Sequence, residues 1–140
     1  MALAATIDTT EAVISYLHNH DDWPSAYEIH GEELPIGWGL TTAVVVSCDG
    51  GMDRLDIPLP SERFEFHCYG ATTQQARTVA DKVHDILHGA NRVDVTVTEG
   101  TASLAVAQRI LGPYYVREPD TEWPRMVSIY QITFSRWAQS

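Results

Sequence analysis

The chain has 140 residues, of which 44% are hydrophobic, so length and composition predict one globular domain and exclude a disordered polypeptide. Nineteen acidic residues against nine basic ones give a net charge of −10, which argues against direct nucleic-acid binding, because that needs basic groups to displace counterions. The first residues lack the pattern of a signal peptide, and no apolar run approaches the roughly 18 residues that cross a bilayer.

The first predicted element is a helix from about Thr9 to Asn19. Asp8 and Glu11 have the spacing of a capping box, with the aspartate as N-cap. The run Asp21–Pro24 ends this helix.

The segment after this helix carries mixed signals. Tyr27 and Ile29 alternate with polar residues, which permits a short strand, whereas prolines and glycines around Trp38 indicate an irregular loop. The run Ala43–Cys48 is β-branched and almost continuously apolar, which is typical of an inner strand covered on both faces.

A turn and an exposed arm are predicted next. The run Asp49–Gly51 predicts a sharp turn. Between Met52 and Ser61, charged residues alternate with Pro58 and Pro60, a pattern that fits an extended arm or a hairpin better than an inner strand.

The stretch Glu62–Gly89 holds two periodicities in succession. Phe64, Phe66 and Cys68 alternate with polar residues, which predicts a strand with one buried face. After Gly70 the apolar residues repeat with helical spacing and predict an amphipathic helix that packs on the sheet; its stripe is Ala76, Val79, Ala80, Val83, Ile86 and Leu87.

Both ends of this long helix carry capping signals. Thr72 is the expected N-cap, and Gln75 completes a capping box. Gly89 occupies the position where a left-handed residue commonly ends a helix.

Two further strands are predicted after this helix, and a last one near the end of the chain. The ranges Val93–Val97 and Leu104–Ile110 alternate, although alanines keep a helix possible in the second. Gly112–Pro124 contains three prolines and reads as a loop, and Met126–Trp137 reads as the final strand. We therefore expect an α+β fold, with a mainly antiparallel sheet of about five strands packed by one long and one shorter N-terminal helix. Residues 1–140 are expected to form a single domain with an extended arm at about 49–61.

No motif predicts catalysis. His84 and His88 have zinc-ligand spacing, but a third ligand is not evident, so a solvated helix edge is the favoured interpretation. Several acids near the arm lack the spacing of a calcium loop and read as a solvated surface; these are Asp49, Asp53, Asp56, Glu62 and Glu65. Cys48 and Cys68 read as free thiols. We expect no catalytic residue, no cofactor and no bound metal.

Exposed apolar and aromatic residues in loops are the candidates for protein contacts, because interfaces are enriched in such side chains. The alternative is that several of them plug the ends of a small core. The candidates are Trp23, Trp38, Met52, Leu55, Ile57, Tyr114, Tyr115 and Trp123.

Three stretches resemble the tail terminator (tail completion) proteins of long-tailed bacteriophages. They are a strand closed by a double glycine at Ala43–Gly51, a strand followed by an alanine-rich helix at Arg63–Leu87, and a Gly-Pro turn leading to a long strand at Leu111–Phe134. Their order and spacing span about two thirds of the chain. The region around Trp38 and the acidic arm have no counterpart in this pattern.

The resemblance implies a structural virion protein. Proteins of this family form a hexameric ring on the head-proximal end of the tail tube, stop its polymerisation and join it to the head-side connector. The implied partners are the chain itself, the tail tube protein and the head-closure (stopper) protein, without a membrane, and assembly occurs in the host cytoplasm. An acidic ring would repel phosphates, so DNA passes through without specific binding.

A closed ring needs two different patches on each subunit. We expect the arm to supply one patch and the later loop to help form the other. The first comprises Asp49, Met52, Asp53, Arg54, Leu55, Asp56 and Ile57, and the second Tyr114, Tyr115, Arg117 and Trp123.

Two alternatives remain open. One is the head-closure or stopper ring of the same neck. The other is a small enzyme or ligand-binding α+β domain with a pocket between the long helix and the sheet. A buried polar cluster with perturbed ionisation, for example around His67, would indicate the latter.

Overall fold

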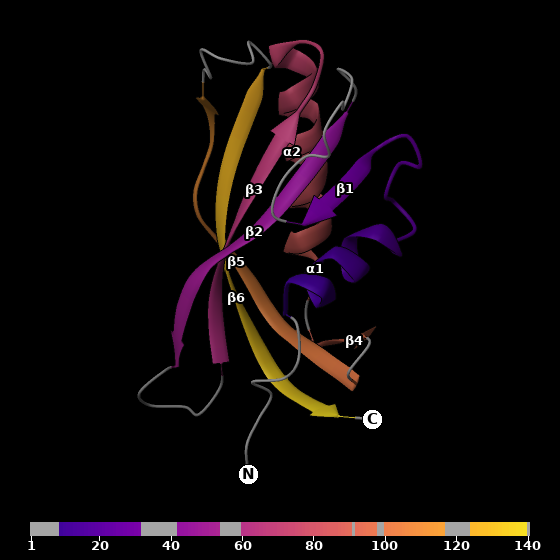
Figure 1. Ribbon diagram of the computed structural model, residues 1–140, viewed down its shortest axis with the longest axis vertical. Coiled ribbons are helices and arrows are strands. Elements are labelled where there is room, and N and C mark those ends of the chain that lie inside the picture. Colours follow the sequence, from indigo (N-terminus) through magenta and orange to yellow (C-terminus); the bar gives the residue numbers. More distant parts are fainter. Residues whose placement is uncertain are drawn as a thin grey trace.

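Two helices and six strands form the part of the chain that the computed structural model describes, namely residues 9–31, 42–53, 60–90, 92–97, 100–116 and 124–139 (Figure 1). This confirms the predicted α+β class, with one strand more than expected. In chain order the elements are α1 (Thr9–His18), β1 (Glu28–Gly31), β2 (Ala43–Asp53), β3 (Pro60–Tyr69), α2 (Thr73–His88), β4 (Val93–Val97), β5 (Gly100–Val116) and β6 (Arg125–Gln139).

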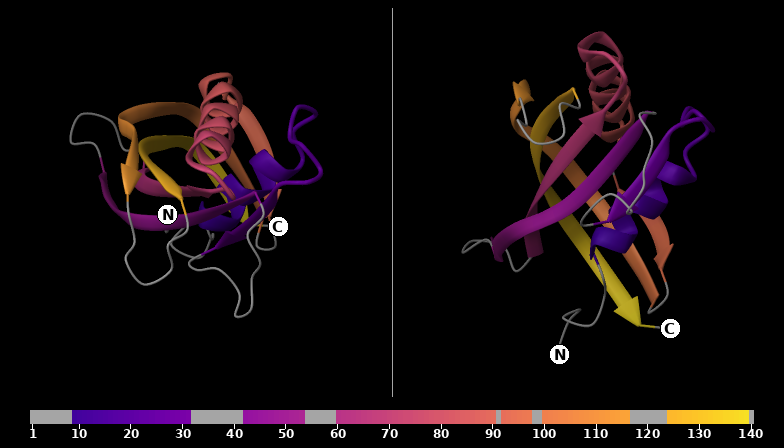
Figure 2. Two further views of the ribbon diagram at one scale, coloured as in Figure 1. Left: turned by 90° about the horizontal axis from the view of Figure 1, so that it is seen from above. Right: turned by 45° about the horizontal axis from the view of Figure 1, so that its top comes forward.

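The strands form one sheet in the order β1-β2-β3-β6-β5-β4. Every neighbouring pair is antiparallel except β1 and β2, which are parallel. The strands twist strongly, and the sheet curls around the helices (Figure 2). In this strand order, β6, the last strand in the sequence, lies in the middle of the sheet.

The two helices cover the concave face of the curled sheet. Helix α2 packs on β3, β5 and β6, whereas α1 contacts both β1 and β4, the first and last strands of the sheet order. Helix α1 thus bridges the two edges that the curl brings toward one another (Figure 2).

Helix α2 forms as its periodicity predicts, and its whole apolar stripe is buried. The Thr72 hydroxyl accepts a hydrogen bond from the Gln75 amide (3.1 Å), and the Gln75 side chain accepts one from the Ala71 amide (3.0 Å), which is a capping box with its return bond shifted by one residue. The prediction for Gly89 was wrong. This residue has φ −84° and keeps a right-handed conformation, and its amide bonds back to Ile86.

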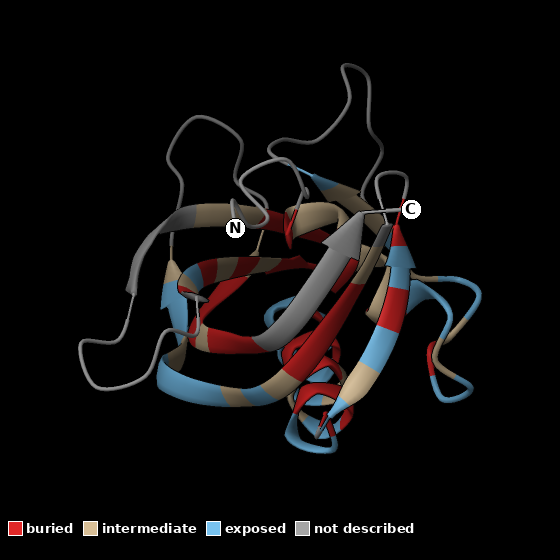
Figure 3. Cartoon of the chain, turned by 90° about the horizontal axis from the view of Figure 1, so that it is seen from below, coloured by how far each residue is buried: buried red, intermediate tan, exposed pale blue. Residues whose placement is uncertain are grey.

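One core cluster joins both helices to five of the strands. Strand β2 is buried on both faces, as predicted, because Val44 and Val46 lie in the main core while Ala43 and Val45 pack with Tyr69 on the other face. The degree of burial along the chain is coloured in Figure 3.

Two predicted irregular segments are strands instead. The turn at Asp49–Gly51 was wrong, because β2 continues to Asp53 and a shift in register after Cys48 absorbs the extra residues. The loop predicted from Gly112 was also wrong at its start, because β5 runs on to Val116. Gly112 adopts φ +94° there, a conformation that glycine allows.

Candidate functional site

The second half of β5, from Val106 to Val116, is the most exposed strand segment of the described structure, and we call it the β5 overhang. None of its residues is buried. Its large apolar side chains are between 39% and 52% exposed, and they are Val106, Ile110, Leu111, Tyr114 and Tyr115. Among the residues whose burial the structure describes, no other large hydrophobic side chain reaches this exposure.

The overhang exists because β4 is much shorter than β5. Strand β4 pairs with β5 only from Gly100 to Leu104, and the Arg92 amide makes a last hydrogen bond to the Ala105 carbonyl (3.3 Å). Beyond Ala105, β5 is paired with β6 on one side and with no strand on the other, as far as the described residues show. Residues Met126–Tyr130 of β6, which face the overhang, are buried. The buried part of the sheet therefore ends between β6 and the overhang.

Sequence reasoning found only part of this surface. The alternation of Leu104, Val106 and Ile110 predicts a strand with these residues on one face, yet Leu104 is buried and the other two are half exposed. Register shifts between Ser103 and Leu104 and between Leu104 and Val106 explain the difference, because a bulge turns the residues after it.

The residues predicted to join subunits divide between two places. Met52 of β2 pairs with Ser61 of β3, which in turn pairs with Thr133 of β6. Tyr114 of β5 pairs with Val127 of β6. Because Thr133 and Val127 are about 20 Å apart along β6, the two candidate patches lie at opposite ends of the sheet (Figure 1). Asp49, Met52 and Asp53 lie in β2, and Tyr114 and Tyr115 in β5, while Arg54, Leu55, Asp56, Ile57, Arg117 and Trp123 fall outside the described residues.

Among the other contact candidates, Trp23 is a core residue. It is 8% exposed and packs edge-to-face against Tyr27. The alternative reading, in which a tryptophan plugs the end of the core, therefore holds for Trp23. Trp38 lies outside the described residues.

A partly buried polar pair links α2 to the middle of the sheet. The Nδ1 atom of His84 lies 2.8 Å from the Tyr130 hydroxyl, so His84 is not the solvated residue that was predicted, whereas His88 is exposed. Burial is the main cause that lowers the pKa of His84 and raises that of Tyr130, and Arg109, the β5 partner of Tyr130, lowers both. Both side chains are therefore neutral near pH 7.

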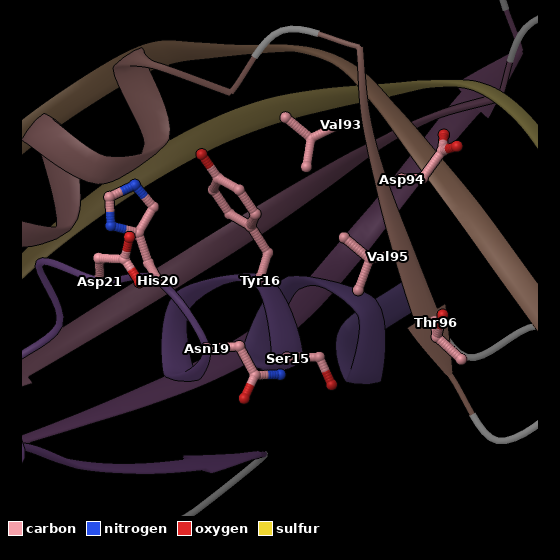
Figure 4. Close-up of a pocket in the computed structure, with 9 residues that line it drawn as sticks. All are labelled: Ser15, Tyr16, Asn19, His20, Asp21, Val93, Asp94, Val95 and Thr96. Atoms are coloured by element: carbon pink, nitrogen blue, oxygen red, sulfur yellow. The ribbon is translucent and has the colours of Figure 1, made fainter.

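The described residues also form one open pocket of about 460 Å³ between α1 and β4. Figure 4 shows Tyr16 projecting from α1 between His20 and the β4 valines. The Tyr16 hydroxyl donates to the Ile86 carbonyl (3.1 Å), and burial raises the pKa of this phenol. Tyr16 therefore stays protonated, and neither His84 nor Tyr130 lines the pocket.

Among the acids near the arm, the structure describes the side chains of Glu62 and Glu65. The Glu62 carboxylate accepts hydrogen bonds from the Thr9 hydroxyl (2.7 Å) and the Cys48 thiol (3.0 Å), so the prediction of a solvated acid is wrong for Glu62. Glu65 contacts His67 at 3.2 Å. Across the described ranges, no group of three His, Cys, Asp or Glu residues could hold a metal.

Neither cysteine forms a disulfide, as predicted. Cys48 faces Phe64 and Cys68 faces Val44, so the thiols lie about 13 Å apart along neighbouring strands. Burial raises the pKa of Cys68, which makes this thiol a poor nucleophile. No helix in the described ranges is long and apolar enough to cross a membrane.

The fold is thus a curled, mainly antiparallel sheet with two helices on its concave face and the exposed β5 overhang beyond the end of β4. Comparison with solved structures finds this fold in a chain from the virion of a native gene transfer agent (GTA) particle. The TM-score is 0.59 at 17% sequence identity, and the likeness covers 88% of this chain and 91% of that chain. No protein-family model and no curated protein matches the sequence.

Proposed function

We propose that this chain is a structural protein of a phage-like virion, and that it acts as a tail terminator. In this role a hexameric ring caps the head-proximal end of the tail tube, stops its polymerisation and joins it to the head-side connector. The observation that carries the proposal is the fold shared, over nearly the whole length of both chains, with a component of a gene transfer agent virion.

The arrangement of the candidate patches supports a ring. The end of the β2–β3 hairpin and the end of β5 are different surfaces at opposite ends of the sheet. A head-to-tail contact between two unlike surfaces is what a cyclic assembly of identical subunits requires. The net charge of −10 suits a channel through which DNA slides.

A mass measurement with and without tail tube protein tests this function. We expect light scattering to show a hexamer, alone or on the tube, and electron microscopy to show tubes that stop growing when the chain is added. A chain that leaves tube growth unchanged contradicts the tail terminator role. Binding to a portal-side adaptor in place of the tube would favour the head-closure alternative.

Deletion of Met52–Ile57 tests the predicted arm. We expect the variant to stay folded, because every described residue of the core cluster lies outside this range, and to lose tube capping, because one subunit patch is gone. Circular dichroism and the capping assay measure the two properties separately. A deletion variant that still caps tubes removes the arm from the interface.

A further inference from the structure

We propose that the outer edge of the β5 overhang accepts a strand from a second copy of this chain, so that the sheets of two subunits join edge to edge. The inference deepens the proposed ring, and it rests on the proposed function for the closed geometry. The pairwise contact itself needs no tail component.

The backbone supplies the first argument. About half of the N–H and C=O groups of an edge strand point away from its single neighbour. On β5 the last such group with a described partner is the Ala105 carbonyl, which accepts from Arg92. The edge from Val106 to Leu111 therefore offers a row of unused donors and acceptors to another strand.

The side chains supply the second argument. Ile110 lies at a register shift between Arg109 and Leu111, and Ile110 and Leu111 are both about half exposed. Tyr114 and Tyr115 pair with successive residues of β6, so they point to opposite faces, and both are exposed. A long edge with apolar residues on both faces is a template for association unless a partner covers it.

Pro113 limits the extent of the pairing. Proline has no amide hydrogen, and the register shift between Leu111 and Tyr114 bends the strand there. We therefore assign the strand pairing to Val106–Leu111 and side-chain contacts to the two tyrosines.

The distribution of charge along the chain indicates that the partner of this edge is a second copy. All nineteen acids lie outside Gly100–Arg117 and Trp123–Ser140, so β5 and β6 carry arginines and no carboxylate in a chain of net charge −10. Arg109 lies on the overhang and is exposed. A second copy presents exposed carboxylates on other elements, including Asp21 and Asp22 after α1, and so complements this edge.

The contact is expected to be head-to-tail. Two overhangs paired with one another would bring two Arg109 side chains together with no acid between them, and like charges across a strand pair are unfavourable. A contact between β5 and a different surface of the next copy avoids this. Such a contact repeats, and it closes into a ring or extends into a fibre.

The test compares the unmodified chain with two double variants that add the same charge. Val106→Glu/Ile110→Glu places two carboxylates on the edge, and Gln74→Glu/Thr78→Glu places two on the exposed surface of α2. All four positions are exposed, so both variants are expected to fold, which circular dichroism checks. Light scattering over a concentration series should show association of the unmodified chain and of the α2 variant, with at least a tenfold weaker association constant for the β5 variant.

Amide hydrogen exchange supplies the backbone readout. The amides of Val106–Leu111 that point outward should exchange rapidly in dilute samples and become protected when the chain associates. Association without this protection overturns strand pairing. Two results would show that a second copy does not bind this edge. One is a β5 variant that associates like the unmodified chain, and the other is an unmodified chain that stays monomeric at every concentration.

Tube capping, measured on the same three proteins, separates this inference from the proposed function. A chain that associates through β5 yet leaves tube growth unchanged keeps the inference and removes the tail terminator role. A chain that caps tubes but stays monomeric in solution keeps the tail terminator role and removes the inference. A β5 variant that still self-associates but no longer binds the tube assigns the edge to the tube protein and overturns the inference.

Discussion

At the scale of single residues, the hydrogen bond between His84 and Tyr130 joins two groups that are both neutral near pH 7. The tautomer of the neutral imidazole decides whether Nδ1 accepts from the phenol or donates to it. The groups that face His84 from its own helix are Asp81, Asp85 and His88, and Arg109 faces it from β5. Burial, Arg109 and His88 together hold its pKa below the ordinary value of 6.5.

This pair makes folding stability depend on pH. As pH falls below about 7, the unfolded chain takes up a proton at this histidine before the folded chain does, so the free energy of unfolding falls. The contribution is complete above pH 6.5 and is lost as pH drops toward the lowered pKa of the folded state. We expect His84→Gln, which is neutral at every pH, to show a smaller loss of stability between pH 7.5 and about 5 than the unmodified chain.

Urea denaturation at several pH values measures this difference. His18→Gln is the control, because His18 is exposed at the end of α1 and is not among the groups that act on His84. The two glutamine variants should separate, with only His84→Gln flattening the dependence on pH. Equal slopes for His84→Gln and the unmodified chain would exclude the pair as the source.

At the scale of elements, two glycines flank α2 and have opposite requirements. A Cβ atom on Gly70 would lie 2.7 Å from the Ala76 amide nitrogen and 2.7 Å from the Gln75 Cβ, so the first turn of the helix leaves no room for a side chain. A Cβ atom on Gly89 would meet only the Ile86 carbonyl at 3.7 Å.

The two alanine variants should therefore behave differently. Gly70→Ala is expected to destabilise the protein by about 1–3 kcal/mol, since the strand-to-helix turn must shift. Gly89→Ala is expected to be neutral or to stabilise by up to about 1 kcal/mol, because its φ suits any residue and alanine restricts the unfolded chain. Thermal unfolding of both variants measures this, and a large loss for Gly89→Ala would show that the left-handed conformation is needed after all.

Periodicity predicted the elements whose pattern is long and unbroken. Helix α2 carries six apolar positions at helical spacing, and β6 alternates over most of its length, so burial of one face dictates each structure. The bulges in β2 and β5 were not predictable in this way. A double glycine and a Gly-Pro pair indicate a turn as readily as a bulge within a strand, and the choice depends on pairing with distant strands.

The β5 overhang was missed for a different reason. Alternation shows which residues share a face, but it does not show whether another strand covers the edge. That depends on the length of β4, which ends after five residues and leaves the rest of β5 unpaired on that side within the described structure. Of this surface, the sequence predicts contacts only for Tyr114 and Tyr115, because it predicts a loop from Gly112 onward.

At the scale of the whole molecule, α1 connects parts that are far apart in the sheet. Leu17 is fully buried in the core cluster, and its helix contacts β1, β2, β4 and α2. A side chain at such a junction stabilises all of these elements together. We therefore expect one cooperative unfolding transition, as for a single domain.

The variant Leu17→Ala should lower the free energy of unfolding by about 2–5 kcal/mol while the transition stays single. Far-UV circular dichroism and tryptophan fluorescence, for which buried Trp23 is a reporter, should give coincident curves. Asn19→Ala, at an exposed position just after α1, serves as control. Transitions that separate in Leu17→Ala would indicate two independently folding parts.

The central position of β6 has a consequence for the timing of synthesis. Strands β1 to β3 and the β4–β5 pair are each complete before β6 emerges from the ribosome, yet they are joined in the sheet only through β6. A nascent chain therefore holds two open half-sheets, and the pairings that unite them are among the slower ones to form, because they link residues far apart in sequence. The surfaces at the two ends of the sheet take their final relative positions only once β6 has been inserted.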